Sequence, residues 1–388
     1  MQTFQHSRRR FLQYSGLAVA GLFLPGISYS RQGGDLLLYV GTYTSGDSVG
    51  IYRCRFQPKT GKLNLIGETP DVVNPSYLAI APGRQHLYAV NETGDYEGRS
   101  SGAVSAFAIN QDSGELTFLN QQASRGAAPC YVSTDDQGKW VLVANYNGGN
   151  LCVLPVDSRG GVGEPTDIVQ HTGTGVNPQR QKGPHAHSVL LDPANRYALS
   201  ADLGIDKILI YRFDGRRGRL LENDPAFAKT APGAGPRHIV FHPNGSFVYV
   251  IDEMGSTIMV FGYDAAHGEL AAIQTVSTLP DTFRGSNTAA DIHVSPDGRF
   301  LYGSNRGHDS LAVFSVHPST GKLSSVGYES TRGHTPRNFT MDPGGNFLLA
   351  ANQNSDSVVI FRRNLKTGTL SAIGDILRIP SPVCLTFL

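Results

Sequence analysis

The sequence predicts an all-β protein, and three observations lead to this prediction. Its 388 residues include 45 glycines, 16 tyrosines and 18 phenylalanines, a composition typical of short strands joined by tight turns. A unit of about 50 residues recurs along the chain. The first copy of this unit lacks its first strand, and the C-terminal residues supply one. These observations favour one closed ring of repeated sheets over a string of separate domains.

The repeat is visible when six segments are aligned, beginning at residues 75, 129, 186, 236, 289 and 336. Each segment starts with a short apolar strand, such as "PRHIVFHPNG", and continues after a turn with a second strand, such as "FVYVID". A third strand follows, and a Gly-x-Leu signal such as "HGELAAI" introduces the fourth. Four strands at this period are typical of a propeller blade.

Two incomplete fragments make up one further blade. Residues 36–66 supply strands two to four, and "SPVCLTFL" at residues 381–388 supplies only a first strand. Joining them closes the ring and removes the open sheet edges that an unfinished ring would expose. The sequence therefore predicts that residues 35–388 form a single seven-bladed β-propeller of four-stranded antiparallel blades, with the first blade closed by the C-terminal strand.

The N-terminus has the pattern of an export signal. "SRRRFLQ" at residues 7–13 precedes an uncharged apolar stretch and the small residues "SYS", which end at Ser30. The paired arginines before Phe-Leu match the twin-arginine type. A transmembrane anchor is less favoured because the apolar run is about 15 residues long, against about 20 for a span. We expect the twin-arginine machinery to export the protein to the periplasm through residues 1–30, with the signal cleaved near Ser30 or retained as an anchor.

Charge and cysteine usage restrict the partners. The chain has 33 basic and 32 acidic residues, a balance that argues against a nucleic-acid partner. Its cysteines have no metal-ligand spacing, so buried thiols are favoured over zinc ligands and over disulfides. The "HAH" phrase at residues 185–187 lacks a second segment that could complete a metal site. We expect no metal, no cofactor and a monomer.

Positions that recur in every blade are explained by the fold. An Asn or Asp closes the second strand of each complete unit, and we expect its side chain to bind backbone groups of the following turn. These residues are Asn91, Asn145, Asp202, Asp252, Asn305 and Asn352. Positions that vary at a fixed place in the blade are the candidates for function.

Two such variable positions lie 16 residues apart in each complete blade, one after the initial Pro or Ala and one after the Asn or Asp. Gly or Asn stands midway in five of the six blades, which predicts a hairpin whose open end holds both positions. Since the first strand lines the channel of a propeller, all these residues should meet at one mouth of the channel. The pairs are Ser76 and Glu92, Cys130 and Tyr146, His187 and Leu203, Arg237 and Glu253, Ala290 and Arg306, Arg337 and Gln353.

The charged members of this set are concentrated in four consecutive blades. One ion pair, such as Arg237 with Glu253, could be purely structural. The addition of His187, Arg306 and Arg337, with His185 nearby, favours a functional site. A carboxylate among arginines and a histidine can act as a base, while the arginines hold an anion and stabilise oxyanion charge. Tyr146, Leu203 and Ala290 leave part of the ring apolar, which suits a small carbon ring.

The chain resembles a known family through several phrases, which include "LYVGTYT", "GPHAHSV", "PGAGPRHIVFHPNG" and "HVSPDGRFLYGSNRGHDSLAVFSV". It is similar to the propeller-type lactonases, which include 6-phosphogluconolactonase and the carboxy-cis,cis-muconate cyclising enzymes, over essentially everything after the signal. The resemblance implies metal-independent opening of an anionic sugar lactone. It implies catalytic roles for Glu253, Arg237, Arg306 and either His185 or His187. We add Arg337, Glu92, Tyr146 and His308 as candidates for substrate binding.

Several alternatives stay open at this point. Arg237 and Arg306 would bind and polarise the lactone carboxyl or a substrate phosphate, and either Glu253 or a histidine would activate water. The export signal puts the phosphate in doubt, because the family members of sugar metabolism act in the cytoplasm. A carboxymuconate-type lactone cycloisomerase and a non-catalytic propeller that serves as a binding module are the other hypotheses.

Overall fold

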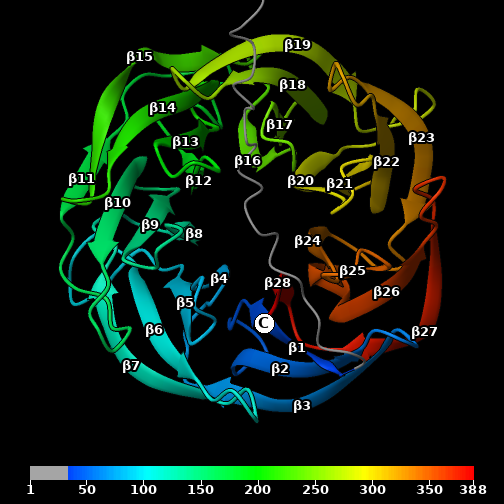
Figure 1. Cartoon of the computed structure of the whole chain (residues 1–388), viewed down its shortest axis with the longest axis horizontal. Coiled ribbons are helices and arrows are strands. Elements are labelled where there is room, and N and C mark those ends of the chain that lie inside the picture. The colour runs from blue at the N-terminus through cyan, green and yellow to red at the C-terminus, as the bar shows by residue number, and fades with distance from the viewer. Residues whose placement is uncertain (1–33) are drawn as a thin grey trace, which may run out of the picture. The chain divides into compact units, whose positions relative to one another are not determined.

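The computed structural model describes residues 34–388, which form seven four-stranded antiparallel sheets around a central channel (Figure 1). This arrangement confirms the predicted seven-bladed β-propeller. The predicted export signal at residues 1–30 lies outside the described residues. Among the described residues, no helix is both long enough and apolar enough to cross a membrane.

The first four blades contain strands β1 to β15 and β28. Blade 1 consists of β28 (Pro382–Phe387), β1 (Leu36–Thr42), β2 (Gly50–Gln57) and β3 (Lys62–Pro70). Blade 2 consists of β4 (Leu78–Ile80), β5 (His86–Asn91), β6 (Ala103–Ile109) and β7 (Leu116–Ala123). Blade 3 consists of β8 (Pro129–Thr134), β9 (Trp140–Asn145), β10 (Asn150–Pro155) and β11 (Asp167–Gln170). Blade 4 consists of β12 (Ala186–Leu191), β13 (Tyr197–Asp202), β14 (Lys207–Asp214) and β15 (Arg219–Lys229).

The remaining three blades follow the same order from the channel outward. Blade 5 consists of β16 (Pro236–Phe241), β17 (Phe247–Asp252), β18 (Thr257–Asp264) and β19 (Glu269–Ser277). Blade 6 consists of β20 (Thr288–Val294), β21 (Phe300–Arg306), β22 (Ser310–Val316) and β23 (Leu323–Ser330). Blade 7 consists of β24 (Pro336–Met341), β25 (Phe347–Asn352), β26 (Ser357–Arg363) and β27 (Leu370–Arg378), with a short 3-10 turn, η1 (Gln353–Ser355).

The two ends of the propeller chain meet in blade 1, as predicted. Strand β28 pairs antiparallel with β1, with Leu38 opposite Phe387 and Val40 opposite Leu385. The backbone N–H of Leu388 also donates a hydrogen bond to the carbonyl oxygen of Leu37. The C-terminal strand therefore covers the channel-facing edge of β1 and closes the ring.

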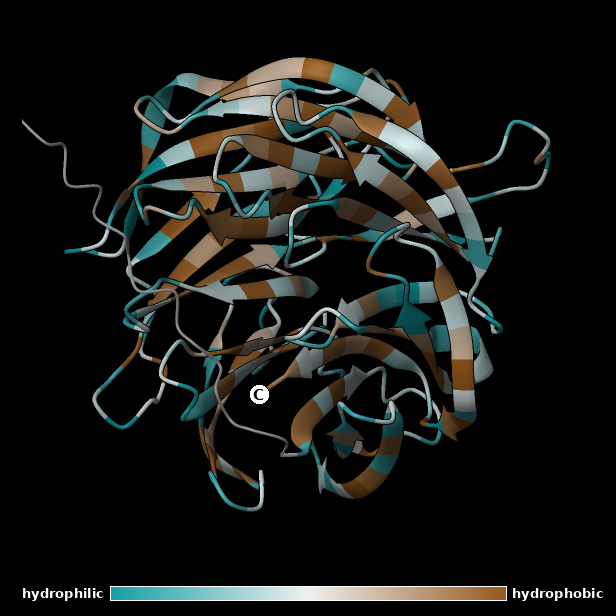
Figure 2. Ribbon diagram, turned by 45° about the vertical axis from the view of Figure 1, so that its right-hand side comes forward, coloured by the Kyte–Doolittle hydropathy of each residue, from teal (hydrophilic) through white to brown (hydrophobic). Residues whose placement is uncertain are grey.

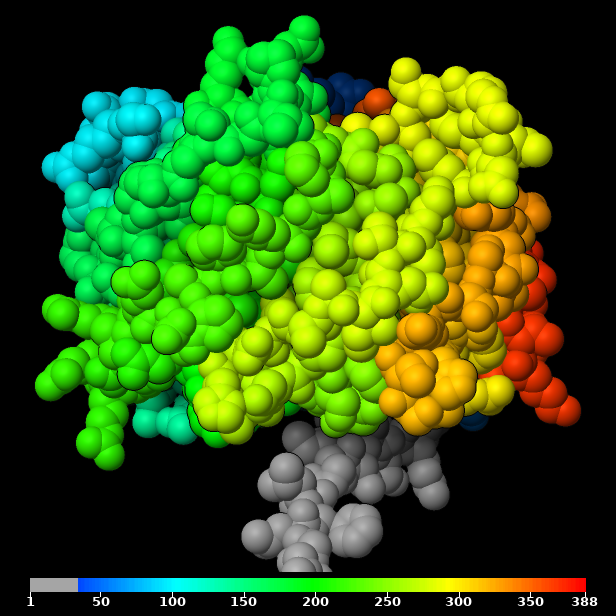
Figure 3. All heavy atoms as spheres, turned by 90° about the horizontal axis from the view of Figure 1, so that it is seen from above, coloured from blue at the N-terminus to red at the C-terminus, as the bar shows by residue number. Residues whose placement is uncertain are grey.

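The hydrophobic core is divided into seven clusters, one between each pair of neighbouring blades. Between blades 5 and 6, for example, Tyr249 and Ile251 pack with Leu301 and Phe314. Hydrophobic residues mark the strands, whereas the connecting loops are mostly polar (Figure 2). The edge view shows the residues of blades 4 to 6 packed side by side, in green to orange (Figure 3). Burial between sheets thus rigidly positions the inner strands that line the channel.

The turns between strands one and two require left-handed backbone at their midpoints. Gly245 and Asn195 have φ values of 70° and 57°, as expected of residues chosen for such turns. In blade 2 the midpoint is Arg84, which itself adopts a φ of 58°. The adjacent Gly83 does not take over this role, so the hairpin geometry is kept in blade 2 without a glycine.

The Asn and Asp residues that close the second strands are structural, but most of their partners differ from those predicted. The side-chain amides of Asn91, Asn305 and Asn352 donate hydrogen bonds to the carbonyl oxygens of Val73, Thr278 and Thr331. These carbonyls lie in the loops that lead into each blade, not in the turns that follow strand two. Each amide therefore ties its blade to the preceding connection. The cysteines, all four of which lie in the described chain, are buried and unpaired.

Candidate active site

The residues at one mouth of the channel owe their position to a backbone irregularity. In blade 5, Pro236 pairs with Asp252 and His238 pairs with Ile251, so Arg237 is an extra residue without a partner in the ladder. Such a β-bulge turns a side chain out of the regular alternation of a strand. The same register shift occurs at Cys130, His187 and Arg337. The sequence comparison had aligned these positions without revealing that they are bulges.

Glu253 lies at the centre of the resulting cluster, and its side chain is 7% exposed. Its Oε2 atom lies 3.1 Å from Arg237 Nε and 2.8 Å from Arg306 Nη2. Its Oε1 atom accepts a hydrogen bond of 2.7 Å from Arg180 Nη2. His187 Nε2 lies 4.0 Å from Oε2. The structure thus brings three other candidate site residues, Arg237, Arg306 and His187, together around the carboxylate of Glu253.

The charges in this cluster stabilise one another. Burial alone would raise the pKa of Glu253, but the charges of Arg306 and Arg237 and the hydrogen bond from Arg180 outweigh burial and hold that pKa well below its usual range. Burial lowers the pKa of Arg306 to about 10. The charge of Glu253 raises this pKa, whereas the charges of the neighbouring arginines lower it further. At neutral pH the carboxylate is therefore ionised and Arg306 is charged.

Arg180 is a member of the cluster that the sequence comparison missed. It lies in the loop between β11 and β12, outside the repeated strands, and its Nη2 atom also donates to Tyr146 Oη at 3.1 Å. Its side chain is 40% exposed. The loop is anchored by Gln181, whose amide donates to the carbonyl oxygen of Leu203 and to Asp206. A comparison of strand ends cannot detect a residue that a loop carries in.

The other side of the mouth contains a second carboxylate. Glu92 Oε2 accepts hydrogen bonds from Ser76 Oγ at 2.5 Å and from Tyr43 Oη at 2.9 Å. The guanidinium of Arg337 lies 5.4 Å from the centre of the Tyr43 ring. Burial opposes the charge of Arg337, but Tyr43 and Glu92 raise its pKa above the usual value. Tyr43 was also missed. It stands directly after the second strand of the split first blade, at the variable position that Glu92 and Glu253 occupy in their blades.

The two histidines of the "HAH" phrase occupy different environments. His185 Nδ1 lies 2.9 Å from the carbonyl oxygen of Tyr146, and the two rings stack at 4.4 Å. Because a carbonyl oxygen only accepts, Nδ1 carries a proton, and in the neutral ring Nε2 presents a lone pair. His187 is 3% exposed and lies against the Cys130 thiol, with 3.7 Å between Nδ1 and Sγ. Burial and the charge of Arg237 hold the pKa of His187 well below its usual value, so its ring is neutral.

One predicted substrate-binding residue lies apart from this cluster. His308 Nδ1 hydrogen-bonds with Ser310 Oγ, and its ring packs on Phe283 and Tyr328. Tyr328 belongs to β23, the outermost strand of blade 6, so His308 is directed away from the channel. His308 follows Arg306 and Gly307 in the sequence, but the chain reverses direction at this turn, so the side chains of His308 and Arg306 have different contacts.

The described residues contain no group of three or more His, Cys, Asp and Glu side chains that could hold a metal ion. The charged cluster instead has an excess of cations. Four positive charges meet two negative ones at the channel mouth. The cations are Arg180, Arg237, Arg306 and Arg337, and the anions are Glu253 and Glu92. Within the described chain, the buried Nε of Arg306 also has no hydrogen-bond partner. The mouth of the channel therefore suits an anion that accepts hydrogen bonds.

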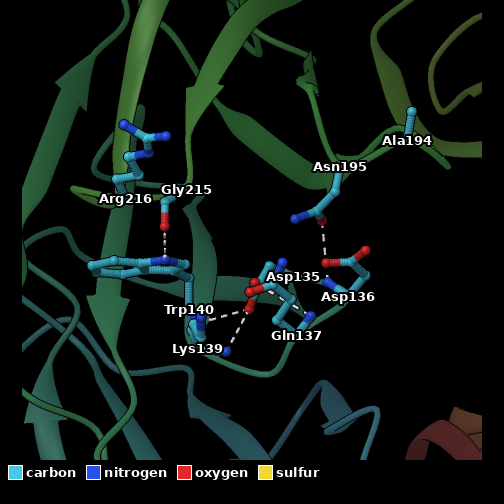
Figure 4. Close-up of a pocket in the computed structure, with 9 residues that line it drawn as sticks. All are labelled: Asp135, Asp136, Gln137, Lys139, Trp140, Ala194, Asn195, Gly215 and Arg216. Carbon is cyan, nitrogen blue, oxygen red and sulfur yellow. Dashed lines mark hydrogen bonds between the residues drawn. The ribbon is translucent and has the colours of Figure 1, made fainter.

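A pocket of about 560 Å³ lies at the other end of the blades, among their hairpin turns (Figure 4). Its polar groups already serve the turns. Asp135 accepts hydrogen bonds from the backbone N–H groups of Lys139 and Trp140, and Trp140 Nε1 donates to the carbonyl oxygen of Gly215. No predicted site residue lines this pocket, so it does not compete with the channel mouth as the candidate site.

Comparison with known proteins agrees with this arrangement. The family described as "Lactonase, 7-bladed beta-propeller" matches residues 37–387. The 6-phosphogluconolactonase of Bacillus subtilis is 40% identical over 350 residues, which cover 90% of this chain and 97% of that protein. The 6-phosphogluconolactonase of Formosa agariphila is 36% identical over 312 residues, covering 78% of this chain and 86% of that protein.

A solved structure gives a similar result. The periplasmic gluconolactonase of Pseudomonas aeruginosa superposes with a TM-score of 0.84 at 36% sequence identity, covering 92% of this chain and 99% of that one. The relatives and the propeller architecture together support lactone hydrolysis as the class of reaction.

Proposed function

Because this chain belongs to the seven-bladed β-propeller lactonase family, we propose that it hydrolyses a sugar lactone at the arginine-rich mouth of its channel. The observation that carries this proposal is the convergence of Arg180, Arg237 and Arg306 on the buried carboxylate of Glu253. Such a cluster supplies fixed positive charge next to a cavity mouth, where charge develops during acyl transfer.

Substrate binding would use the donors that the protein leaves free. Within the described residues, Arg237 Nη2 and Arg306 Nε have no hydrogen-bond partner. In the proposed complex Arg237 Nη2 donates to the lactone carbonyl, while Arg180 or Arg337 contacts the hydroxyl groups of the sugar. A guanidinium presents its N–H donors in a rigid fork, which would orient the ring for attack.

Glu253 is proposed to hold the arginines and not to act as the base. Both of its oxygens already accept hydrogen bonds or ion pairs, and its pKa lies well below the usual range. A carboxylate with so low a proton affinity is a weak general base at neutral pH. Its proposed contribution is electrostatic, because it keeps Arg237 and Arg306 close together in spite of their mutual repulsion.

We assign the role of general base to His185. Its Nδ1–H is committed to the Tyr146 carbonyl oxygen, which leaves Nε2 able to accept a proton from water. The water oxygen would then form a bond to the lactone carbonyl carbon, and the arginines would stabilise the tetrahedral oxyanion. Cleavage of the ring C–O bond, with return of the proton from His185 to the ring oxygen, gives the open hydroxy acid. His187, buried and neutral, would form the wall of the site.

The relatives leave open whether the substrate is phosphorylated, and the export signal bears on this question. The relative in Bacillus subtilis is named for a phosphorylated lactone, and the structure from Pseudomonas aeruginosa is called a periplasmic gluconolactonase. The twin-arginine pattern at residues 7–13 favours the second comparison, so we propose an exported enzyme that acts on an unphosphorylated aldonolactone. Replacing Arg8 and Arg9 by Lys should abolish export of a reporter fusion; unchanged export would contradict this localisation.

The direct test of the proposed activity is an assay of the purified protein on three lactones in the presence of EDTA. The substrates are glucono-δ-lactone, 6-phosphogluconolactone and a muconolactone, with product identity read by NMR. We expect hydrolysis of a sugar lactone to its hydroxy acid, faster for glucono-δ-lactone and insensitive to EDTA. Isomerisation of the muconolactone alone, or no reaction above the spontaneous rate, would overturn the proposal.

A further inference from the structure

A second layer of polar side chains lies directly below the charged cluster. It consists of the residues that follow the bulge positions, and it contacts the next blade in several places. His238 bonds to Asp291, Asn338 Nδ2 bonds to Asp291, and Asn338 Oδ1 accepts the N–H of Leu385. These bonds run from blade 5 through blades 6 and 7 to the closing strand β28.

His238 is the member of this layer that touches the candidate active site. Its Nδ1 atom lies 2.8 Å from Asp291 Oδ1, and its Nε2 atom lies 3.2 Å from Arg237 Nη1. Both His238 and Asp291 are almost completely buried. The charge of His293, 3.0 Å away, and the hydrogen bonds from both histidines overcome the effect of burial and hold the pKa of Asp291 well below its usual range. Asp291 is therefore an ionised acceptor.

This contact determines which nitrogen of His238 carries the proton. A carboxylate only accepts hydrogen bonds, so Nδ1 is protonated. Burial, together with the charge of Arg237, lowers the pKa of His238 to about 4, so the ring is neutral. Its Nε2 atom therefore presents a lone pair, and Arg237 Nη1 donates to it.

The same geometry accounts for three of the five N–H donors of Arg237. Nε donates to Glu253, and the two hydrogens of Nη1 go to the carbonyl oxygen of Ala290 at 2.6 Å and to His238. A guanidinium has five N–H donors in a rigid plane. Three are thus used, and the two on Nη2 have no partner within the part of the chain described by the structure. Arg237 is 2% exposed, so its orientation is set by these contacts and not by solvent.

We propose that the His238–Asp291 pair is a positioning device for Arg237, which holds the guanidinium so that Nη2 is presented to the carbonyl oxygen of the lactone. This role rests on the proposed lactonase function of the same site. Asp291 acts through the tautomer of His238, since the other tautomer would direct an N–H toward the N–H of Arg237. A similar control of imidazole tautomer by a buried carboxylate is known from hydrolases of unrelated fold.

A purely structural alternative is that His238 and Asp291 only link blades 5 and 6. The variant Asp291→Asn separates the two roles. Asn338 Nδ2, at 2.6 Å, and the backbone N–H of Phe339, at 3.2 Å, both donate to Asp291 Oδ2. Among the described residues, only one backbone donor, the N–H of Ile292 at 3.0 Å, faces Oδ1 besides His238, so the two donors at Oδ2 favour an asparagine that places its oxygen there and its NH₂ toward His238 Nδ1. The proton of His238 then moves to Nε2 and repels Arg237, while the link between the blades is kept.

The experiment compares wild type, D291N and the double variant D291N/H238Q. We expect D291N to lower kcat/KM about 100-fold through displacement of Arg237, and the double variant to recover much of this loss because the glutamine oxygen can accept from Arg237. Nitrogen-15 NMR should show the changed tautomer in D291N and a shifted guanidinium signal of Arg237. Full activity in D291N with a changed tautomer, or equal losses in both variants, would overturn the proposal.

Two further measurements keep the test decisive. If D291N does not fold, the pair H238Q and H238L replaces it, and equal activity in these two variants would contradict the positioning role. If the wild type opens no lactone, gluconate and 6-phosphogluconate are used as anionic probes in calorimetry with the same variants. Weaker binding in D291N that H238Q restores would then support the positioning role even though the lactonase proposal had failed. Unchanged binding in D291N would refute the role.

Discussion

Arg180 Nη2 donates a hydrogen bond of 2.7 Å to Glu253 Oε1, although the two residues are 73 positions apart and come from a loop and a strand end in different parts of the ring. Arg180 is also the most exposed of the three arginines that contact Glu253. It is therefore the arginine best placed to exchange the carboxylate of Glu253 for an oxygen atom of a substrate.

We predict that Arg180→Ala lowers kcat/KM for the preferred lactone by about 10- to 100-fold, because a hydrogen bond to a charged group contributes about 1.5–3 kcal/mol. The free energy of unfolding should change by about 1 kcal/mol or less, since the side chain is 40% exposed and solvent screens the pair. Steady-state kinetics and thermal unfolding measure the two effects. Arg216→Ala, on the opposite face, is the control and should leave both unchanged. Equal kinetics in the two variants would remove Arg180 from the site.

Glu253→Gln should affect stability as well as activity. The substitution leaves the buried guanidiniums of Arg237 and Arg306 without a counter-charge, so we expect a loss of about 3–5 kcal/mol in the free energy of unfolding and at least a 100-fold fall in kcat/KM. Chemical denaturation and lactone kinetics test these values. Glu222→Gln, on an exposed strand position, is the matched control.

The stability effect of Glu253 should depend on pH in a defined direction. Its folded-state pKa is depressed, so the carboxylate contributes stability above the unfolded-state pKa of about 4.3, and this contribution is lost as pH falls toward the folded-state pKa. The difference in unfolding free energy between wild type and Glu253→Gln should therefore be constant near neutral pH and shrink below about pH 4. A difference that grows on acidification would contradict the assigned charge state.

His185→Asn tests the assignment of the base. The asparagine amide can still donate to the Tyr146 carbonyl oxygen in place of Nδ1, but it has no basic nitrogen in place of Nε2. We expect kcat to fall about 10²- to 10⁴-fold with little change in thermal stability. His187→Asn is the comparison. A larger loss of kcat in His187→Asn than in His185→Asn would contradict the assignment and make His187 the general base.

Removal of residues 382–388 should destroy the cooperative fold. These residues form the strand that covers the edge of β1, and Cys384 and Leu385 are buried in the clusters on either side of blade 1. We expect aggregation and loss of a sharp unfolding transition, measured by light scattering and calorimetry. A permutant that joins Leu388 to Asp35 and opens the chain before β28 preserves every strand and should fold. A stable, monomeric truncation would show that ring closure is dispensable.

The repeat pattern was sufficient to predict the blades because each strand carries its own signals. Alternating apolar residues, left-handed turn residues such as Gly245, and the Asn or Asp at the end of strand two recur at nearly constant spacing. The same spacing placed Arg237 and Glu253 at one end of a hairpin, and their contact at 3.1 Å follows from it. Periodicity along the chain thus predicts both the sheets and the ring of residues at their ends.

The chemistry of the site depended on contacts that periodicity does not encode. Arg180 reaches Glu253 from a loop, Tyr43 belongs to the blade that the two chain ends share, and His308 turns outward although its sequence neighbour Arg306 turns inward. The protonation of His238 and the choice of Glu253 as an anchor depend on which groups surround each atom. Local sequence specifies strands and turns through nearest neighbours, whereas charge, burial and tautomer are set by residues that only the packing of blades and loops brings within hydrogen-bond distance.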